Sequence, residues 1–157
     1  MIVRRPATGE REILHTAELD LEHGLVGDSW KARGSNSTPD KSANRDMQLT
    51  LMNSRVIALL AREKDRWPLA GDQLYVDMDL SLEHLPPGTQ LGFGSAVLEV
   101  TAPPHTGCKK FKERFGQEAM QFVNSPVGLQ LRLRGMNARI VRAGVVRVGD
   151  KVKKISA

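Results

Sequence analysis

The alternation of apolar and polar residues predicts a chain built mainly from short strands. At 47–52 the sequence Met-Gln-Leu-Thr-Leu-Met alternates with a period of two, which places Leu49 and Leu51 on one face of a strand. Similar runs recur between turn-forming Gly, Pro, Asn and Asp residues. The predicted strands are 11–19, 47–52, 71–79, 90–93, 96–101, 134–142 and 145–155.

Helical spacing is confined to a few segments. Asn53 or Ser54 caps a predicted helix that ends before Pro68. A second predicted helix opens at Cys108, and a third spans 117–124, where Ser125-Pro126 is expected to end it. Many short strands with a few helices favour an α+β fold, mainly β, arranged as a closed or partly open barrel with flanking helices.

Composition limits the class of protein. With 157 residues, 40% hydrophobic and 26% charged, the chain is predicted to be one globular domain over 1–157. Its single cysteine excludes an intrachain disulfide and suits a reducing compartment. The sequence has no 18-residue apolar run and no apolar leader segment, so we expect a cytoplasmic protein that does not contact a membrane.

The net charge of +5 suggests an anionic partner: nucleic acid, an acidic protein or a phosphorylated small molecule. Aromatic residues make up only 4% of the chain and offer few stacking platforms, so nucleic acid is the least favoured. A solvated basic surface without a specific partner is the simplest alternative.

Cys108 is the residue with the most informative surroundings. It follows Thr106 and Gly107 and precedes Lys109 and Lys110. Positive charge and helix-terminal N–H groups favour the thiolate, the form that attacks sulfur, carries a persulfide or ligates a soft metal. The alternative is a buried cysteine that acts as a small apolar residue.

Several basic residues are candidates for binding an anionic cofactor. Lys109 and Lys110 neighbour the thiol, and Arg114 lies one helical turn beyond Lys110. The arginines of other segments that we include are Arg45, Arg134 and Arg139. For each one, a solvent-facing charge is the simpler explanation.

Other chemistries find less support. His105 and Cys108 would supply only two of the four ligands of a structural zinc ion, so no zinc is expected. His105 is poorly placed to act as a base for Cys108, because it lies only three residues away around a glycine turn. We interpret it as a turn residue or a polar wall of the pocket. Phe111 and Phe115, four residues apart, are predicted core anchors.

Seven motifs together resemble the MOSC domain, the family named for the C-terminal domain of molybdenum cofactor sulfurases. Their order and the cysteine context carry the resemblance, which covers the chain from about residue 20 to its end. One departure is Gly107, where many relatives have proline. The motifs are 24–28 (Gly-Leu-Val-Gly-Asp), 45–51 (Arg-Asp-Met-Gln-Leu-Thr-Leu), 87–101 (Pro-Gly-Thr-Gln-Leu-Gly-Phe-Gly-Ser-Ala-Val-Leu-Glu-Val-Thr), the Cys108 stretch, 124–128 (Asn-Ser-Pro-Val-Gly), 132–135 (Arg-Leu-Arg-Gly) and 148–150 (Val-Gly-Asp).

This resemblance implies a barrel-type fold and a role for the matching Cys108. In the family, the cysteine is proposed to carry persulfide sulfur from a pyridoxal-phosphate desulfurase, which makes a cysteine desulfurase or a molybdenum enzyme the expected partner. Pyridoxal phosphate would then belong to that partner. In other relatives the cysteine ligates molybdenum in a pterin cofactor, which implies the alternative of a reductase of N-hydroxylated substrates. A basic interaction domain without catalysis is the third alternative.

Overall fold

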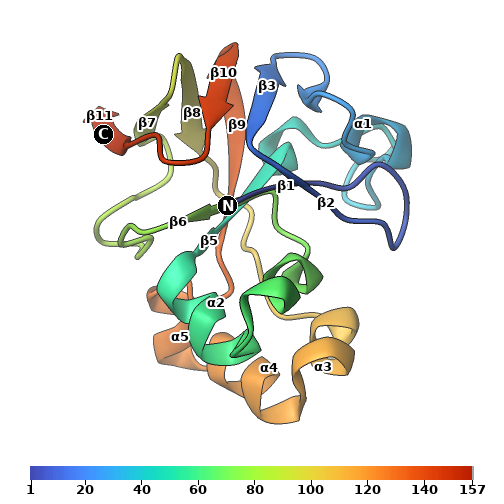
Figure 1. Cartoon of the computed structure of the whole chain (residues 1–157), viewed down its shortest axis with the longest axis vertical. Coiled ribbons are helices and arrows are strands. Elements are labelled where there is room, and N and C mark those ends of the chain that lie inside the picture. The colour runs from blue at the N-terminus through green and yellow to red at the C-terminus, as the bar shows by residue number, and fades with distance from the viewer. Residues whose placement is uncertain (157) are drawn as a thin grey trace.

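The computed structural model describes residues 1–156, and Figure 1 shows strands in one half of the molecule and most helices in the other. The strands are β1 (Ile2–Arg4), β2 (Glu12–Leu14), β3 (Thr16–Asp20), β4 (Gly24–Leu25), β5 (Leu49–Asn53), β6 (Leu74–Val76), β7 (Gln90–Phe93), β8 (Ala96–Val100), β9 (Met136–Arg142), β10 (Gly144–Arg147) and β11 (Val152–Ser156). The α-helices are α1 (Trp30–Arg33), α2 (Ser54–Ala61), α3 (Lys109–Phe115), α4 (Gln117–Asn124) and α5 (Pro126–Gln130), and the 3-10 helices are η1 (Arg45–Met47) and η2 (Lys64–Ala70).

Two sheets form the β half. The larger has eight strands in the order β11-β7-β8-β9-β5-β6-β1-β2, and the smaller has the order β10-β3-β4. Neighbouring strands are antiparallel apart from β5 and β6, which pair in parallel. Parallel neighbours need a crossover, and α2 and η2 provide it. The larger sheet curls into a partly open half-barrel, which confirms the predicted mainly β, α+β fold.

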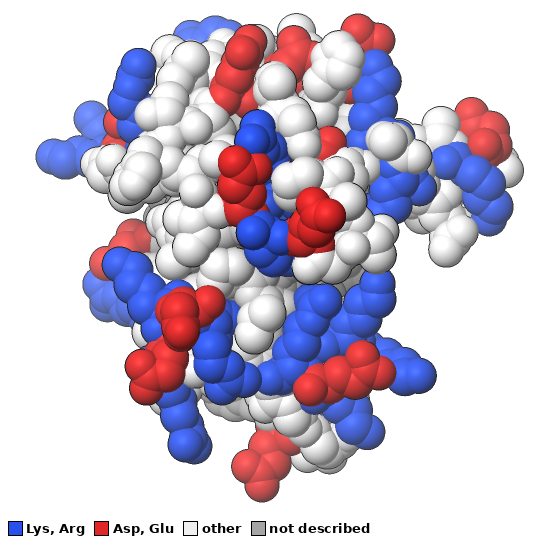
Figure 2. Space-filling model, turned by 45° about the vertical axis from the view of Figure 1, so that its right-hand side comes forward, with Lys and Arg blue, Asp and Glu red and all other residues white. Residues whose placement is uncertain are grey.

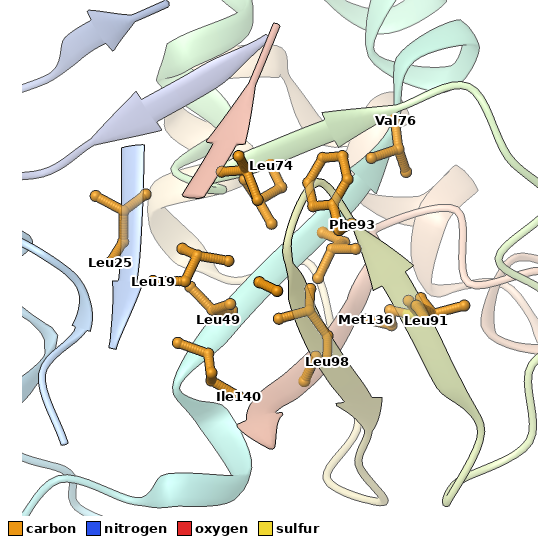
Figure 3. Close-up of a cluster of buried hydrophobic side chains, with 14 of the residues drawn as sticks. Leu19, Leu25, Leu49, Leu74, Val76, Leu91, Phe93, Leu98, Met136 and Ile140 are labelled. Carbon is orange, nitrogen blue, oxygen red and sulfur yellow. The ribbon is translucent and has the colours of Figure 1, made fainter. Parts of the chain in front are cut away.

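Strand β5 runs between two hydrophobic clusters and is buried on both faces. Leu49 and Leu51 belong to the larger cluster, which fills the half-barrel (Figure 3). Met52 belongs to the smaller cluster, which lies between the sheet and the helices and includes Ile57 of α2 and Phe111 of α3. Phe111 and Phe115 pack with their ring centroids 4.9 Å apart; Phe111 is buried and Phe115 half-buried.

The capping chemistry of α2 agrees with the sequence. The side chain of Asn53 accepts hydrogen bonds from the backbone N–H groups of Arg55 and Val56, which satisfies two donors of the first turn. Strand 90–93 and helix 117–124 have their predicted boundaries.

One C-terminal prediction was wrong. Segment 145–155 is two strands, because a turn at Gly149, with φ of +97°, directs β10 to β3 and β11 to β7. Ser125-Pro126 ends α4 as predicted, and it also starts α5, since the Ser125 hydroxyl accepts the N–H of Gly128 and proline suits the first helical position.

Between residues 1 and 156 there is no helix whose length and apolar character would let it span a bilayer.

Candidate functional site

Cys108 lies exposed at the position that caps the N-terminus of α3. Its carbonyl oxygen accepts the N–H of Lys112 at 3.0 Å, while its side chain makes no capping hydrogen bond. The thiol is therefore accessible to a reagent or a partner, which excludes the alternative of a buried, apolar cysteine.

Asn124, the last residue of α4, holds the backbone next to Cys108. Its Oδ1 accepts the Gly107 N–H at 2.8 Å, and its Nδ2 donates to the Gly107 carbonyl at 2.9 Å. We call this pair of bonds the Gly107–Asn124 clamp. A Cβ on Gly107 would lie 3.0 Å from Cγ2 of Val123, so glycine allows the backbone to approach α4. The φ angle of Gly107 is not positive, so close packing is the reason for this glycine.

A buried charge network includes His105, which lies three residues before Cys108 in the sequence. Asp72 Oδ1 accepts from His105 Nε2 at 2.9 Å, and Asp72 Oδ2 accepts from Arg134 Nη1 at 2.6 Å. The Asp72 side chain is fully buried, and 18% of the His105 side chain is exposed. Burial alone would raise the pKa of Asp72, but Arg134 and His105 outweigh burial and lower this pKa to about 2.

Arg134 connects this network to α3. Its Nη2 donates to the Ala70 carbonyl at 2.8 Å, and its guanidinium carbon lies 4.9 Å from the centroid of the Phe111 ring. Phe111 belongs to the helix that Cys108 opens, so the cation–π contact helps to fix that helix against the network. Arg134 is thus buried and paired with a carboxylate.

His105 has one ring nitrogen engaged and one available. Burial, followed by Arg134, lowers the pKa of His105, and Asp72 only partly offsets them, so the imidazole is neutral near pH 7. Because Asp72 is ionised, Nε2 carries the proton and Nδ1 presents a lone pair. Among residues 1–156 no protein group hydrogen-bonds to Nδ1. The sequence-based view of His105 as a polar pocket wall agrees with its place beside two cavities.

The first of these cavities, the polar cavity, has a volume of about 280 Å³. Two arginines, three asparagines and the imidazole supply most of its polar lining, and the Oδ1 of Asn137 is buried without a hydrogen-bond partner in the described chain. Such an orphaned acceptor fits a ligand that brings an N–H or O–H group. The polar lining residues are Arg5, Arg33, Asn36, Asn44, Asn137 and His105.

Arg5 is oriented by a carboxylate. Its Nη2 lies 2.9 Å from Asp28 Oδ1, and its Nη1 donates to the Gly71 carbonyl, next to Asp72. Asp28 also accepts the N–H of Trp30 at the start of α1, so it caps a turn.

The second cavity, the apolar cavity, has a volume of about 360 Å³. His105 and Arg132 are among the residues that line it. Most of the remaining wall is hydrocarbon, from Leu82, Pro103, Pro104, Val123, Leu129 and Met136.

The other predicted basic residues lie outside both cavities. Lys109 and Lys110 are exposed beside Cys108, and Lys109 faces Glu113 at 4.0 Å. Arg114 donates to the Leu69 carbonyl at 2.7 Å. Thr106 is exposed. Figure 2 shows Lys and Arg side chains mixed with acidic ones over the helical half of the molecule.

Arg45 and Arg139 belong to another part of the surface. Arg139 reaches Glu99 at 2.6 Å and Asp46 at 3.1 Å, and Asp46 follows Arg45 in η1. The Nη2 of Arg45 donates to the Leu21 carbonyl at 3.3 Å. Within residues 1–156, no three His, Cys, Asp or Glu side chains converge in a way that could hold a metal ion.

The sequence analysis did not select Arg5, Asp72, Asn124 and Asn137, nor the residues Arg33, Asn36 and Asn44 that also line the polar cavity. Asp72 follows Gly71 just before a strand, and an acidic residue entering an apolar strand is a signal of a buried partner. Asn124 at a helix end and Asn137 in a strand have no distinguishing pattern.

Comparison with known proteins places these features in a wider context. The model of the MOSC domain matches residues 38–153. No curated protein sequence matches the chain.

Solved structures share the fold. A protein described as hypothetical is 19% identical with a TM-score of 0.67, covering 99% of this chain and 67% of the other. YiiM from Escherichia coli is 19% identical with a TM-score of 0.64, covering 99% and 68%. The YUAD protein from Bacillus subtilis is 16% identical with a TM-score of 0.61, covering 96% and 91%.

Proposed function

Since its residues 38–153 match the family model, the chain belongs to the MOSC domain family, and from this premise we propose that Cys108 carries persulfide sulfur in molybdenum cofactor handling. The family is linked to molybdenum cofactor sulfurases. The observation that carries the proposal is the exposed sulfur of Cys108 on a backbone held by the Gly107–Asn124 clamp. An exposed thiol on an ordered backbone suits transfer between two protein partners.

The chemistry is thiol–persulfide exchange. The Cys108 thiolate attacks the outer sulfur of a persulfide on the donor, a pyridoxal-phosphate-dependent cysteine desulfurase. A new S–S bond forms at Cys108, the donor S–S bond breaks, and the donor cysteine leaves as a thiolate, which takes up a proton. In the second step, a nucleophile on the acceptor attacks the outer sulfur of the Cys108 persulfide, and Cys108 leaves as a thiolate. Lys109 and Lys110, both exposed, supply positive charge beside the anionic sulfur.

A second candidate is supported by the polar cavity, whose arginine and asparagine lining suits an anionic pterin cofactor. Arg5 and Arg33 would attract the phosphate, and the orphaned Oδ1 of Asn137 would accept a ring N–H. When bound, such a cofactor would supply molybdenum redox chemistry, and Cys108, which is not among the residues that line this cavity, would have to reach the metal as a soft ligand. The protein would then reduce N-hydroxylated substrates with two electrons from an external reductant and two protons, which breaks the N–O bond and releases water. His105 would line the cavity as a hydrogen-bond acceptor.

The replacement Cys108→Ser tests whether the thiol takes part in either chemistry or has only a structural role. Incubation with a cysteine desulfurase, pyridoxal phosphate and cysteine should add one sulfur atom to the intact mass of the unmodified protein and none to the variant. Because the side chain is exposed, the variant should unfold at the same temperature as the parent protein.

Molybdenum content decides between the two candidates. Both proteins are purified from a host that synthesises the pterin cofactor and are analysed for metal. Stoichiometric molybdenum in the parent protein that is lost in Cys108→Ser supports the reductase, and sulfur uptake without molybdenum supports the carrier. Sulfur uptake by the variant equal to that of the parent would contradict the carrier role.

A further inference from the structure

Arg132 lines the apolar cavity, and no carboxylate of residues 1–156 pairs with its guanidinium. We propose that this cavity binds a small apolar monocarboxylate, an aromatic or aliphatic acid whose carboxylate pairs with Arg132 while its hydrocarbon body lies in the cavity. Cys108 does not line the cavity, so this proposal goes beyond the proposed function and does not depend on it.

Part of the Arg132 guanidinium is already bonded within the protein. Its Nη1 donates to the Leu85 carbonyl at 2.7 Å and to the Leu80 carbonyl at 3.3 Å. The same nitrogen lies 3.7 Å from the Sδ of Met136, which lines the cavity, so the guanidinium is held at the cavity wall. Its Nε and Nη2 donate to no group among residues 1–156. Two neighbouring donors are thus left on a half-buried side chain.

Arg5 of the same protein shows what such a pair of donors binds. Its Nη1 donates to the Gly71 carbonyl, while its Nε and Nη2 each donate to one carboxylate oxygen of Asp28 at 2.9 Å. A carboxylate matches the two parallel donors of a guanidinium. Arg132 likewise uses Nη1 for backbone carbonyls, but its Nε and Nη2 have no such partner in the described chain. A ligand carboxylate would complete the arrangement.

The missing counter-charge favours an acid over a neutral molecule of the same shape. Burial lowers the pKa of Arg132, and no acidic group of the described chain offsets this effect. An arginine nevertheless stays protonated in proteins, so the cavity wall carries a partly desolvated positive charge. Pairing with an anion would compensate that desolvation.

The backbone at Arg132 gives a second and independent indication. Its φ is +49°, in the left-handed region where a Cβ causes strain. The residue follows α5 in a Schellman motif: the Leu133 N–H donates to the Gly128 carbonyl at 2.9 Å, and the Arg132 N–H donates to the Leu129 carbonyl at 3.2 Å. Glycine usually occupies this position of the motif. Non-glycine residues in such conformations are concentrated at functional sites, which agrees with a ligand contact for this side chain.

The size and the lining of the cavity indicate the rest of the ligand. A volume of about 360 Å³ lies in the range of small-molecule sites, which is about 300–1,000 Å³. Val123 and Met136 supply buried hydrocarbon, and Leu82 and Leu129 line the cavity while still partly exposed. The Leu82 N–H donates to the Gln130 carbonyl at 3.0 Å, which fixes the loop against α5. An apolar body beside the carboxylate would cover these leucines.

Matched ligands test the proposal on ¹⁵N-labelled protein made without the pterin cofactor. Benzoate should shift the amide signals of Leu82, Leu129 and Gly135 in a saturable manner and leave that of Asn36, at the polar cavity, in place. Benzamide keeps the ring but lacks the charge, and acetate keeps the charge but lacks the ring. Each should bind at least about tenfold more weakly. Equal binding of either one, or no benzoate binding at this cavity, would overturn the proposal.

A pair of arginine variants tests the role of the guanidinium. Arg132→Gly removes the side chain and suits the left-handed backbone. Arg62→Gly is the control, since Arg62 is an exposed arginine whose φ is +64°. Arg132→Gly should weaken benzoate binding at least about tenfold and leave the weak binding of benzamide unchanged, whereas Arg62→Gly should change neither. If the preference for benzoate over benzamide survives in Arg132→Gly, Arg132 does not pair with the carboxylate and the proposal fails.

Two further variants keep the apolar wall and the thiol separate in this test. Leu129→Asn should weaken benzoate binding about tenfold, because it replaces hydrocarbon in the wall with an amide. Full benzoate affinity in Leu129→Asn would contradict binding in the apolar cavity. Cys108→Ser should bind benzoate like the parent protein, so a failure of sulfur transfer would leave this result unaffected.

Discussion

At the scale of single residues, Asp72 holds together groups from three segments of the chain. It accepts hydrogen bonds from His105 and from Arg134, and no part of its side chain reaches solvent. A buried carboxylate is stable only when it is paired and hydrogen-bonded, and removal of one partner leaves the other charge uncompensated. Asp72 therefore determines both the tautomer of His105 and the position of Arg134.

Asp72→Asn should lower the free energy of unfolding by about 3–5 kcal/mol near neutral pH, because Arg134 would stay buried without its counter-charge. The folded-state pKa of Asp72 is about 2, below its ordinary value of 3.8. Its stabilising effect is therefore complete above that ordinary value and lost as the pH falls toward 2. Urea unfolding at several pH values should show a flatter acid limb for the variant.

The matched control for this measurement is Asp77→Asn, at an aspartate whose side chain is 61% exposed and pairs with Arg55 on the surface. It should leave both the stability and the acid limb as they are in the parent protein. An Asp72→Asn variant as stable as this control would contradict a structural role for the network.

The part of the site that could be predicted consists of residues that are close together in the sequence. Cys108, Lys109 and Lys110 are sequence neighbours, so their shared chemistry is visible in the sequence. Asp72 and Arg134 meet only because β5 pairs with both β6 and β9, and no local pattern encodes that pairing. Phosphate binding by Arg45 and Arg139 remains a prediction, although Arg139 is engaged by two carboxylates.

At the scale of elements, helices α3 and α4 act together to position the thiol. The Cys108 backbone begins α3, and Asn124 at the end of α4 grips the preceding residue through two hydrogen bonds. The sequence predicted both helices, since their apolar spacing is regular. It did not predict the clamp, because an asparagine at a helix end has many local roles.

Asn124→Ala should remove both bonds of the clamp and lower the free energy of unfolding by about 1–3 kcal/mol. The freed Gly107 amide should also exchange its hydrogen with solvent much faster, which NMR measures residue by residue. Gln121→Ala, at an exposed position of the same helix, should change neither quantity. Unchanged exchange at Gly107 in Asn124→Ala would argue against the clamp.

At the scale of the whole molecule, β5 separates two hydrophobic clusters and contributes to both. Period-two alternation alone predicts one buried face, with Leu49 and Leu51. The structure buries the opposite face as well, because α2 and α3 cover it, and Met52 packs there. Helix packing on a strand's second face involves segments far along the chain, so the pattern within β5 could not reveal it.

Truncation on either face should therefore be costly. Leu51→Ala and Met52→Ala should each lower the free energy of unfolding by about 2–5 kcal/mol, whereas Leu59→Ala should change it by less than about 0.5 kcal/mol. Chemical denaturation of the three variants checks this. A small effect for Met52→Ala alone would mean that the helices pack loosely on the sheet.

The division of the C-terminal segment between two sheets bears on how the protein is made. Strand β3 obtains its neighbour β10 only from near the end of the chain, and β7 likewise waits for β11. During synthesis on the ribosome these edges stay open until residues 144–156 have emerged, and open strand edges promote aggregation. A nascent chain that lacks β10 and β11 therefore exposes two unpaired edges and is most in need of a chaperone at that stage.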